Sequence, residues 1–177
     1  GIDVLADLGA LEDLTLRSIT LPDLSLLTSL DRLSSLDLKL GGTTNLGLLP
    51  DVGQLKYLEL WMIRDLADLS SIARLDHLEV LSLQSLKNVT RLPDLTKCTR
   101  LRHVQLEKMK GLQDLEPLSG APALQSIQVV DMPHLQPNNF ACLNRSPTLV
   151  QVRAGLGSNK KNIARKPPIL GPQKWAR

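Results

Sequence analysis

The chain has 177 residues and a formal net charge of +3; 40 of its residues are Leu, whereas aromatic residues make up only 2%. A chain of this length is enough for one ordinary domain, and its apolar content is almost entirely aliphatic, so a conventional mixed core is not expected. No run of about 18 uncharged apolar residues occurs, and no basic-then-apolar leader opens the sequence, so neither a membrane span nor a secretory signal is visible.

A six-residue motif, L-x-x-L-x-L, recurs along the chain at nearly constant spacing. Strict copies begin at residues 11, 33, 55 and 78, a copy containing Val104 begins at 101, and two looser copies begin at 124 and 149. Within each copy, alternate side chains point to the same face, as they do in a β-strand. The motif therefore predicts about seven short parallel strands, one for each repeat.

Between the motifs, apolar residues recur at every third position. The series is clearest from Ile63 to Leu78 and from Met109 to Leu124. A period of three suits 3₁₀ or similarly tight turns. Each repeat is thus predicted to be a short strand followed by a compact return segment that brings the chain back one strand further along.

The repeat resembles the leucine-rich repeat superfamily, in particular its short class of about 22 to 23 residues, to which internalin-like and phosphatase-regulator-like proteins belong. The resemblance covers about residues 2–156 and implies an α/β solenoid. This solenoid would be a curved right-handed superhelix, with a parallel sheet on its concave face and turns or 3₁₀ segments on its convex face.

The sequence departs from the family at the ninth position of the repeat, where Asn is common. That position holds Ile19, Gly41, Ile63, Leu86, Met109 and Met132. Because buried unpaired amides are costly, we expect backbone groups or water to satisfy the bends that follow the strands.

The two ends of the chain differ from the repeats. Ile2, Leu5 and Leu8 occupy return-segment positions with no preceding strand, which indicates an incomplete first repeat of a longer chain or a short natural end. We expect the solenoid to span residues 1–157. Residues 158–177 contain three Pro and no acidic residue, and we expect them to form a basic cap or tail.

The outward-facing side chains of the predicted strands form three columns, at the third, fifth and seventh positions of the repeat. The only Tyr of the repeats and their one Trp both project from the third strand, as Tyr57 and Trp61. Because Trp and Tyr are enriched in interface hot spots, we predict that a protein partner binds this face with these two residues as anchors. The expected polar contacts come from the neighbouring positions Asp37, Lys39, Glu59, Gln84 and His103. Alternatively, Trp61 only shields the irregular segment 41–45.

Two other functions are compatible with the sequence. Residues 1–131 carry a net charge of −5 and residues 132–177 a net charge of +8, so the C-terminal part could bind an anion or an acidic surface. The expected residues are Arg153, Lys160, Lys161, Arg165 and Lys166. Nucleic acid is disfavoured because Trp175 is the only aromatic residue of segment 158–177. The same segment could instead be a solvated tail or dock on the acidic body. Finally, the repeats could act only as a structural spacer in a longer protein.

No catalytic or metal-binding constellation is recognisable. His77, His103 and His134 fall in different repeats and lack a metal-ligand spacing on a common face. Cys98 falls at an apolar position of a return segment and is expected to be a core residue, while the register of Cys142 is undetermined. The chain is therefore predicted not to be an enzyme and to need no cofactor, metal or small-molecule substrate. Two cysteines without a disulfide framework favour a reduced, cytoplasmic protein.

Overall fold

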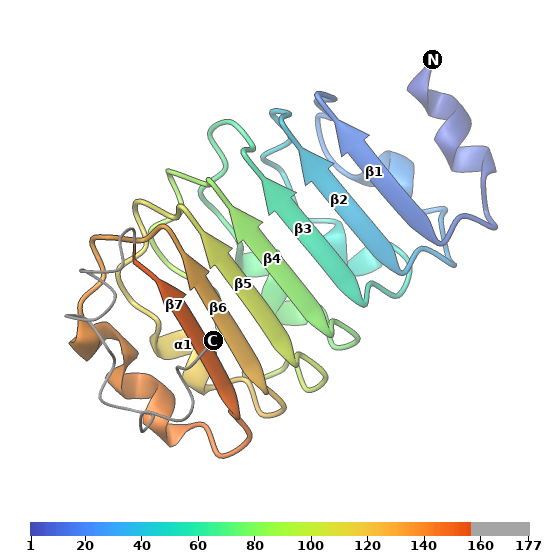
Figure 1. The fold of residues 1–177 in the computed structure, drawn as a ribbon. Coiled ribbons are helices and arrows are strands. Elements are labelled where there is room, and N and C mark those ends of the chain that lie inside the picture. Colours follow the sequence, from blue (N-terminus) through green and yellow to red (C-terminus); the bar gives the residue numbers. More distant parts are fainter. Residues whose placement is uncertain (157–177) are drawn as a thin grey trace.

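The computed structural model describes residues 1–156 and contains one parallel sheet whose seven strands follow the order of the sequence (Figure 1). The strands are β1 (Asp13–Arg17), β2 (Ser35–Lys39), β3 (Tyr57–Trp61), β4 (Val80–Gln84), β5 (His103–Glu107), β6 (Ser126–Val130) and β7 (Gln151–Gly155). The predicted leucine-rich repeat solenoid is confirmed. Each strand begins at the third residue of its motif and ends at the seventh.

Neighbouring strands pair at the same repeat position. Tyr57, for example, lies opposite Ser35 on one side and Val80 on the other, and the same correspondence holds from β1 to β7. The outward-facing residues of the third, fifth and seventh positions therefore form three straight columns, as the sequence predicts.

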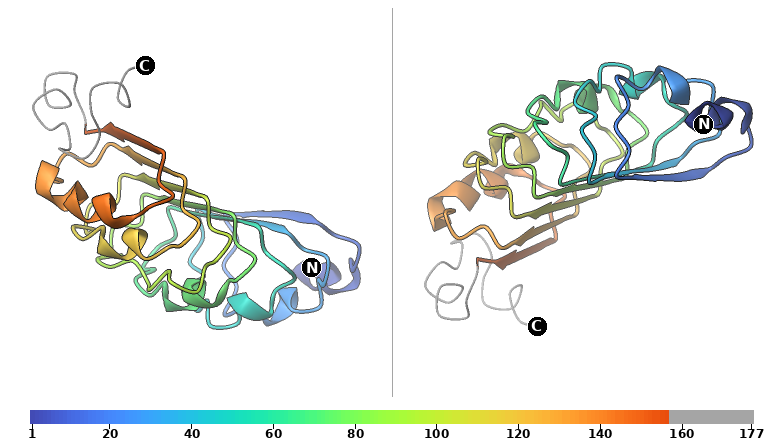
Figure 2. Two further views of the ribbon diagram at one scale, coloured as in Figure 1. Left: turned by 90° about the horizontal axis from the view of Figure 1, so that it is seen from below. Right: turned by 90° about the horizontal axis from the view of Figure 1, so that it is seen from above.

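The return segments all lie on one side of the sheet (Figure 2). The helical ones are η1 (Ile2–Asp7), η2 (Ser25–Leu27), η3 (Leu49–Asp51), η4 (Ser70–Arg74), α1 (Glu116–Ser119) and η5 (Pro137–Arg145). All are 3₁₀ helices except α1, which is a single turn of α-helix. Several return segments begin with an Asx turn: the backbone N–H of Ser70, for example, donates to Asp68 Oδ1 at 2.8 Å.

The core is a continuous stack of aliphatic side chains between the sheet and the return segments. The three-residue series from Ile63 to Leu78 and from Met109 to Leu124 is buried throughout, as predicted. Cys98 is fully buried and is a core residue. The single Phe of the chain, Phe140, fills the space under η5, the longest return segment described.

Backbone hydrogen bonds hold the start of each bend, as expected from the missing asparagines; after β1 and β2, the hydroxyls of Thr20 and Thr43 accept further backbone N–H groups. The eighth residue of the repeat adopts a left-handed conformation, with φ between 50° and 58° at Leu40, Met62, Ser85 and Lys108. The N–H of this residue donates to the carbonyl oxygen of the last residue in the next strand. The Leu40 nitrogen, for example, lies 2.9 Å from the Trp61 carbonyl oxygen. Each bend is therefore held by the neighbouring repeat.

At the N-terminus, Ile2 and Leu5 pack partly against the core, whereas Leu8 is 43% exposed. Only two of the three predicted return-segment residues are thus inward. The predicted basic segment 158–177 lies outside the described residues. No helix among residues 1–156 has the length and apolar character needed to span a membrane.

Candidate functional site

The candidate site lies on the sheet face opposite the return segments, which we call the open sheet face. Among residues 1–156, every helix is on the other side of the sheet (Figure 2). The inward leucines of β2 and β3, such as Leu36 and Leu58, are fully buried and anchor both strands on the core. The backbone that carries the outward side chains between them is therefore held in place.

Charged side chains of β2 and β3 form a compact network on this face. Lys39 Nζ lies 2.8 Å from Asp37 Oδ2 and 2.9 Å from Glu59 Oε2. These three side chains are only 19%, 16% and 15% exposed, respectively. The Tyr57 hydroxyl donates to Glu59 Oε2 at 3.1 Å, and the Thr15 hydroxyl donates to Asp37 Oδ2 at 3.2 Å. We call these five residues the β2–β3 network.

The network changes the acidity of two of its members. The hydrogen bond from Lys39 to Asp37 is the main cause that raises the pKa of Lys39, and the ammonium group stays charged. Burial, followed by the negative charge of Glu59, raises the pKa of Tyr57 from its ordinary value of 10.0 to about 12. Tyr57 is consequently a hydrogen-bond donor at neutral pH, and its donation orients the Glu59 carboxylate.

One acceptor of the network has no partner. Asp37 Oδ1 is buried and receives no hydrogen bond from the described residues. A buried carboxylate oxygen without a donor is unfavourable.

Trp61 is half-buried and stacks with a residue that the sequence analysis did not single out. The guanidinium carbon of Arg17 lies 5.7 Å from the centre of the Trp61 ring, within the range of a cation–π contact. Arg17 and Trp61 occupy the same column two strands apart, on β1 and β3, with Lys39 between them. Shared column position was the signal that could have identified Arg17, because two long side chains in one column can meet across an intervening strand when neighbouring strands are about 4.8 Å apart.

The remaining predicted residues lie farther along the sheet. Gln84 is the β4 neighbour of Trp61 and extends the same column. His103 belongs to β5, where its Nδ1 lies 2.7 Å from the Ser126 hydroxyl, so it is separate from the network. Arg153 is exposed on β7. The other predicted anion-binding residues, Lys160, Lys161, Arg165 and Lys166, lie outside the described residues.

The histidines and thiols are engaged in separate structural contacts. His77 contacts Arg100, and His134 Nε2 lies 2.7 Å from the Leu112 carbonyl oxygen. Burial raises the pKa of Cys98 to about 11, which disfavours the nucleophilic thiolate. Burial also raises the pKa of Cys142, which is half-buried on η5. Within residues 1–156, no group of three or more His, Cys, Asp or Glu side chains could hold a metal ion.

Two solved structures from Listeria monocytogenes share this architecture. Internalin C2 superposes with a TM-score of 0.70 at 23% sequence identity, over 85% of this chain and 64% of that structure. Internalin F superposes with a TM-score of 0.66 at 18% identity, over 84% of this chain and 42% of that structure. The chain thus spans less than two thirds of either internalin. No protein-family model and no curated protein sequence matches it. At these identities, the likeness establishes the fold, which is the leucine-rich repeat solenoid of the internalins.

Proposed function

We propose that the chain is a non-catalytic protein-interaction module and that a protein partner binds its open sheet face over β2, β3 and β4. The observation that carries the proposal is the juxtaposition of Tyr57 and Trp61 with a pre-ordered charged network on a face that no described helix covers. Apolar anchors surrounded by fixed polar groups are typical of interface hot spots.

Tyr57 and Trp61 are suited to the role of anchors because both are held before a partner arrives. The Tyr57 hydroxyl is bound to Glu59, and the Trp61 ring lies under Arg17. Little side-chain entropy remains to be lost when a partner covers them, which reduces the cost of association. Each still presents surface, since both are only partly buried.

The polar residues divide into two roles. Lys39 bridges Asp37 and Glu59 and orders both carboxylates, and Glu59 in turn holds the Tyr57 hydroxyl. Gln84, beside Trp61, and His103, one strand further, supply further polar contacts at the edge of the patch. Lys39 supplies one positive charge against two carboxylates, so the network keeps a negative charge, and we expect the partner to place a hydrogen-bond donor or a cation over it.

The internalin likeness agrees with an interaction module but names no partner for this chain. Binding of an acidic surface through the C-terminal basic residues remains the second function, supported on the described residues by exposed Arg153. A structural spacer remains the third.

A capture experiment distinguishes these functions. The 177-residue chain, a Tyr57→Ala/Trp61→Ala variant and an Ile19→Ala/Val150→Ala control are immobilised and incubated with lysate of the source organism at low and moderate salt. The control removes exposed apolar surface away from the open sheet face. We expect a protein that the parent and the control retain at moderate salt and that the aromatic variant loses.

Two results would count against the proposed binding face. Retention of the same protein by the aromatic variant contradicts the proposed anchors. Capture that disappears between low and moderate salt in all three chains favours the basic segment instead, because contacts between exposed charges are screened by salt. Circular dichroism of each variant verifies that the solenoid is intact.

A further inference from the structure

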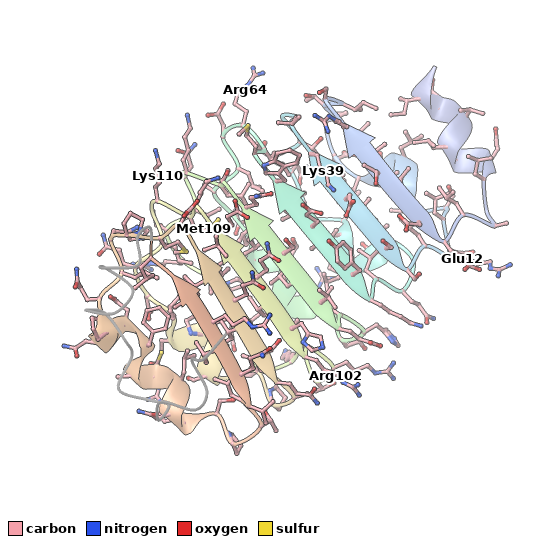
Figure 3. All side chains as sticks on the ribbon, in the orientation of Figure 1. Glu12, Lys39, Arg64, Arg102, Met109 and Lys110 are labelled. Atoms are coloured by element: carbon pink, nitrogen blue, oxygen red, sulfur yellow. The ribbon has the colours of Figure 1, made fainter. Side chains whose placement is uncertain are left out.

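A groove lies along the edge of the sheet at which the strands end, separate from the β2–β3 network. It has a volume of about 520 Å³. Its lining comprises Leu40, Gly41, Met62, Ile63, Arg64, Ser85, Lys87, Lys108 and Lys110. We call it the edge groove. Figure 3 shows Arg64 and Lys110 projecting from this edge, with Arg102 at the opposite edge of the sheet.

The edge groove combines an apolar floor with a cationic rim. The floor is formed by Leu40, Met62 and Ile63, and Met62 is 49% exposed although it is apolar. Four of the nine lining residues are Lys or Arg, and none is acidic or aromatic. A site of this composition favours a ligand that carries negative charge next to an apolar group.

The cations of the rim differ in whether they form ion pairs with acidic residues of the chain. Lys108 Nζ lies 3.2 Å from Glu107 and 3.7 Å from Asp131, so its charge is satisfied within the protein. Arg64, Lys87 and Lys110 are exposed, and within residues 1–156 the structure records no ion pair for any of them. Three positive charges on one edge therefore remain unpaired among the described residues.

The backbone of the groove is preformed. Leu40, Met62, Ser85 and Lys108 are the left-handed residues that follow β2, β3, β4 and β5, and each N–H is bonded to the next strand. The Arg64 N–H also donates to the Gly41 carbonyl oxygen at 2.9 Å. Spacing between the cations is thus fixed by the repeat, which reduces the cost of ordering on binding.

We propose that the edge groove binds an acidic peptide segment of a protein, with one apolar side chain on Met62 and carboxylates on Arg64, Lys87 and Lys110. The apolar floor offers nothing to a free phosphate ion. The lack of aromatic lining residues disfavours single-stranded nucleic acid, which binds largely by stacking on aromatic rings. This inference goes beyond the proposed function, because it requires no partner on the open sheet face.

Binding is measured with a fluorescein-labelled peptide, Glu-Asp-Leu-Asp-Glu, by fluorescence anisotropy at low salt. Two matched peptides replace either the Leu by Ser or all carboxylates by amides. Inorganic phosphate and a labelled oligothymidylate serve as competing ligands. The parent peptide should bind most tightly. Each replacement should weaken binding by about tenfold, because the amides remove charge-assisted contacts and Ser removes apolar burial on Met62.

Four variants locate the binding site. Arg64→Glu/Lys87→Glu/Lys110→Glu should weaken binding of the parent peptide by more than about tenfold, and Met62→Ser should remove the preference for Leu over Ser. The control Lys56→Glu/Lys97→Glu/Arg102→Glu makes the same change in net charge at exposed sites away from the edge groove and should bind normally. Tyr57→Ala/Trp61→Ala should also bind normally, so that this test fails or succeeds independently of the proposed function.

Several results would overturn the inference. These are equal binding to the edge-groove triple variant and to its control, no peptide binding at millimolar concentration, and tighter competition by oligothymidylate or phosphate than by unlabelled peptide. Circular dichroism distinguishes a lost site from a lost fold. If the triple variant does not fold, Met62→Ser alone decides, because its exposed side chain can be shortened without opening the core.

Discussion

The ionisation of Tyr57 provides the most direct test of the β2–β3 network. Tyr57 is the only Tyr in the chain, so the near-ultraviolet absorbance of phenolate reports this residue alone. Burial and the Glu59 carboxylate raise its pKa to about 12, compared with an ordinary value of 10.0. In guanidinium chloride, where both causes are absent, the same residue should titrate near about 10.

The shift also fixes the sign of a stability change. The folded chain retains the phenolic proton between about pH 10 and about pH 12, where the unfolded chain loses it, so this contribution is fully present below pH 10 and decreases above it. Lys39, whose pKa is also raised, acts in the same direction. Two pKa units correspond to about 2.7 kcal/mol, which solvent screening of the partly exposed phenol reduces to about 1 kcal/mol.

The assay compares absorbance and circular dichroism across the alkaline range for the parent and for Glu59→Gln. We expect the substitution to lower the pKa of Tyr57 only part of the way, because burial, the larger cause, is unchanged. A native chain that titrates near pH 10 while its circular dichroism is intact would refute the contacts assigned to Tyr57. An unchanged pKa in Glu59→Gln would refute the role of Glu59.

Three further predictions concern the solenoid. Leu81→Ala, at a fully buried position of β4, should lower the free energy of unfolding by about 2–5 kcal/mol in denaturant titrations, whereas a loss below 1 kcal/mol would contradict tight packing there. Gly53→Ala should cost at least about 2 kcal/mol, because φ is +48° and a Cβ would lie 2.2 Å from the Leu33 carbonyl oxygen; an unchanged melting temperature would be inconsistent with this approach. Cys98 should react with iodoacetamide at neutral pH far more slowly in the native chain than in denaturant, as read by mass spectrometry of the labelled peptides, since it is buried and its pKa is raised to about 11; equal rates would exclude a core position.

The sequence was sufficient to predict the path of the backbone, because the same strand motif recurs seven times at nearly constant spacing. A strand at Val104 or Val152 is ambiguous by itself, but the regular spacing fixes its position and its register with both neighbours. Sequence also identified the outward columns, and hence the placement of Tyr57 beside Ser35 and Val80. The single turn of α-helix at α1 was not foreseen, because short 3₁₀ and α turns satisfy nearly the same apolar pattern.

Side-chain partners were less predictable than backbone register. The repeat positions show which residues are neighbours on the sheet. They do not show that Lys39 contacts Asp37 and Glu59, or that Arg17 reaches Trp61 past Lys39. These contacts depend on side-chain rotamers and on competition among several charges, which the spacing of the repeat does not determine. The edge groove was missed for another reason: its residues belong to four bends, and the spacing within single repeats does not show that the side chains of neighbouring bends enclose a groove.

The regularity of the solenoid determines where binding specificity can arise. Because neighbouring repeats share one backbone register, the shape of the open sheet face is nearly uniform from β1 to β7, and chemistry must distinguish one region from another. Charge and aromatic surface concentrate on β1 to β3, whereas β4 to β6 present mainly uncharged outward positions such as Ser82, Gln105 and Gln128. The edge groove passes the end of β3, since Met62 follows Trp61 directly. A partner that covers the aromatic pair therefore has the unpaired cations within reach, and an acidic segment in that partner would select this end of an otherwise repetitive surface.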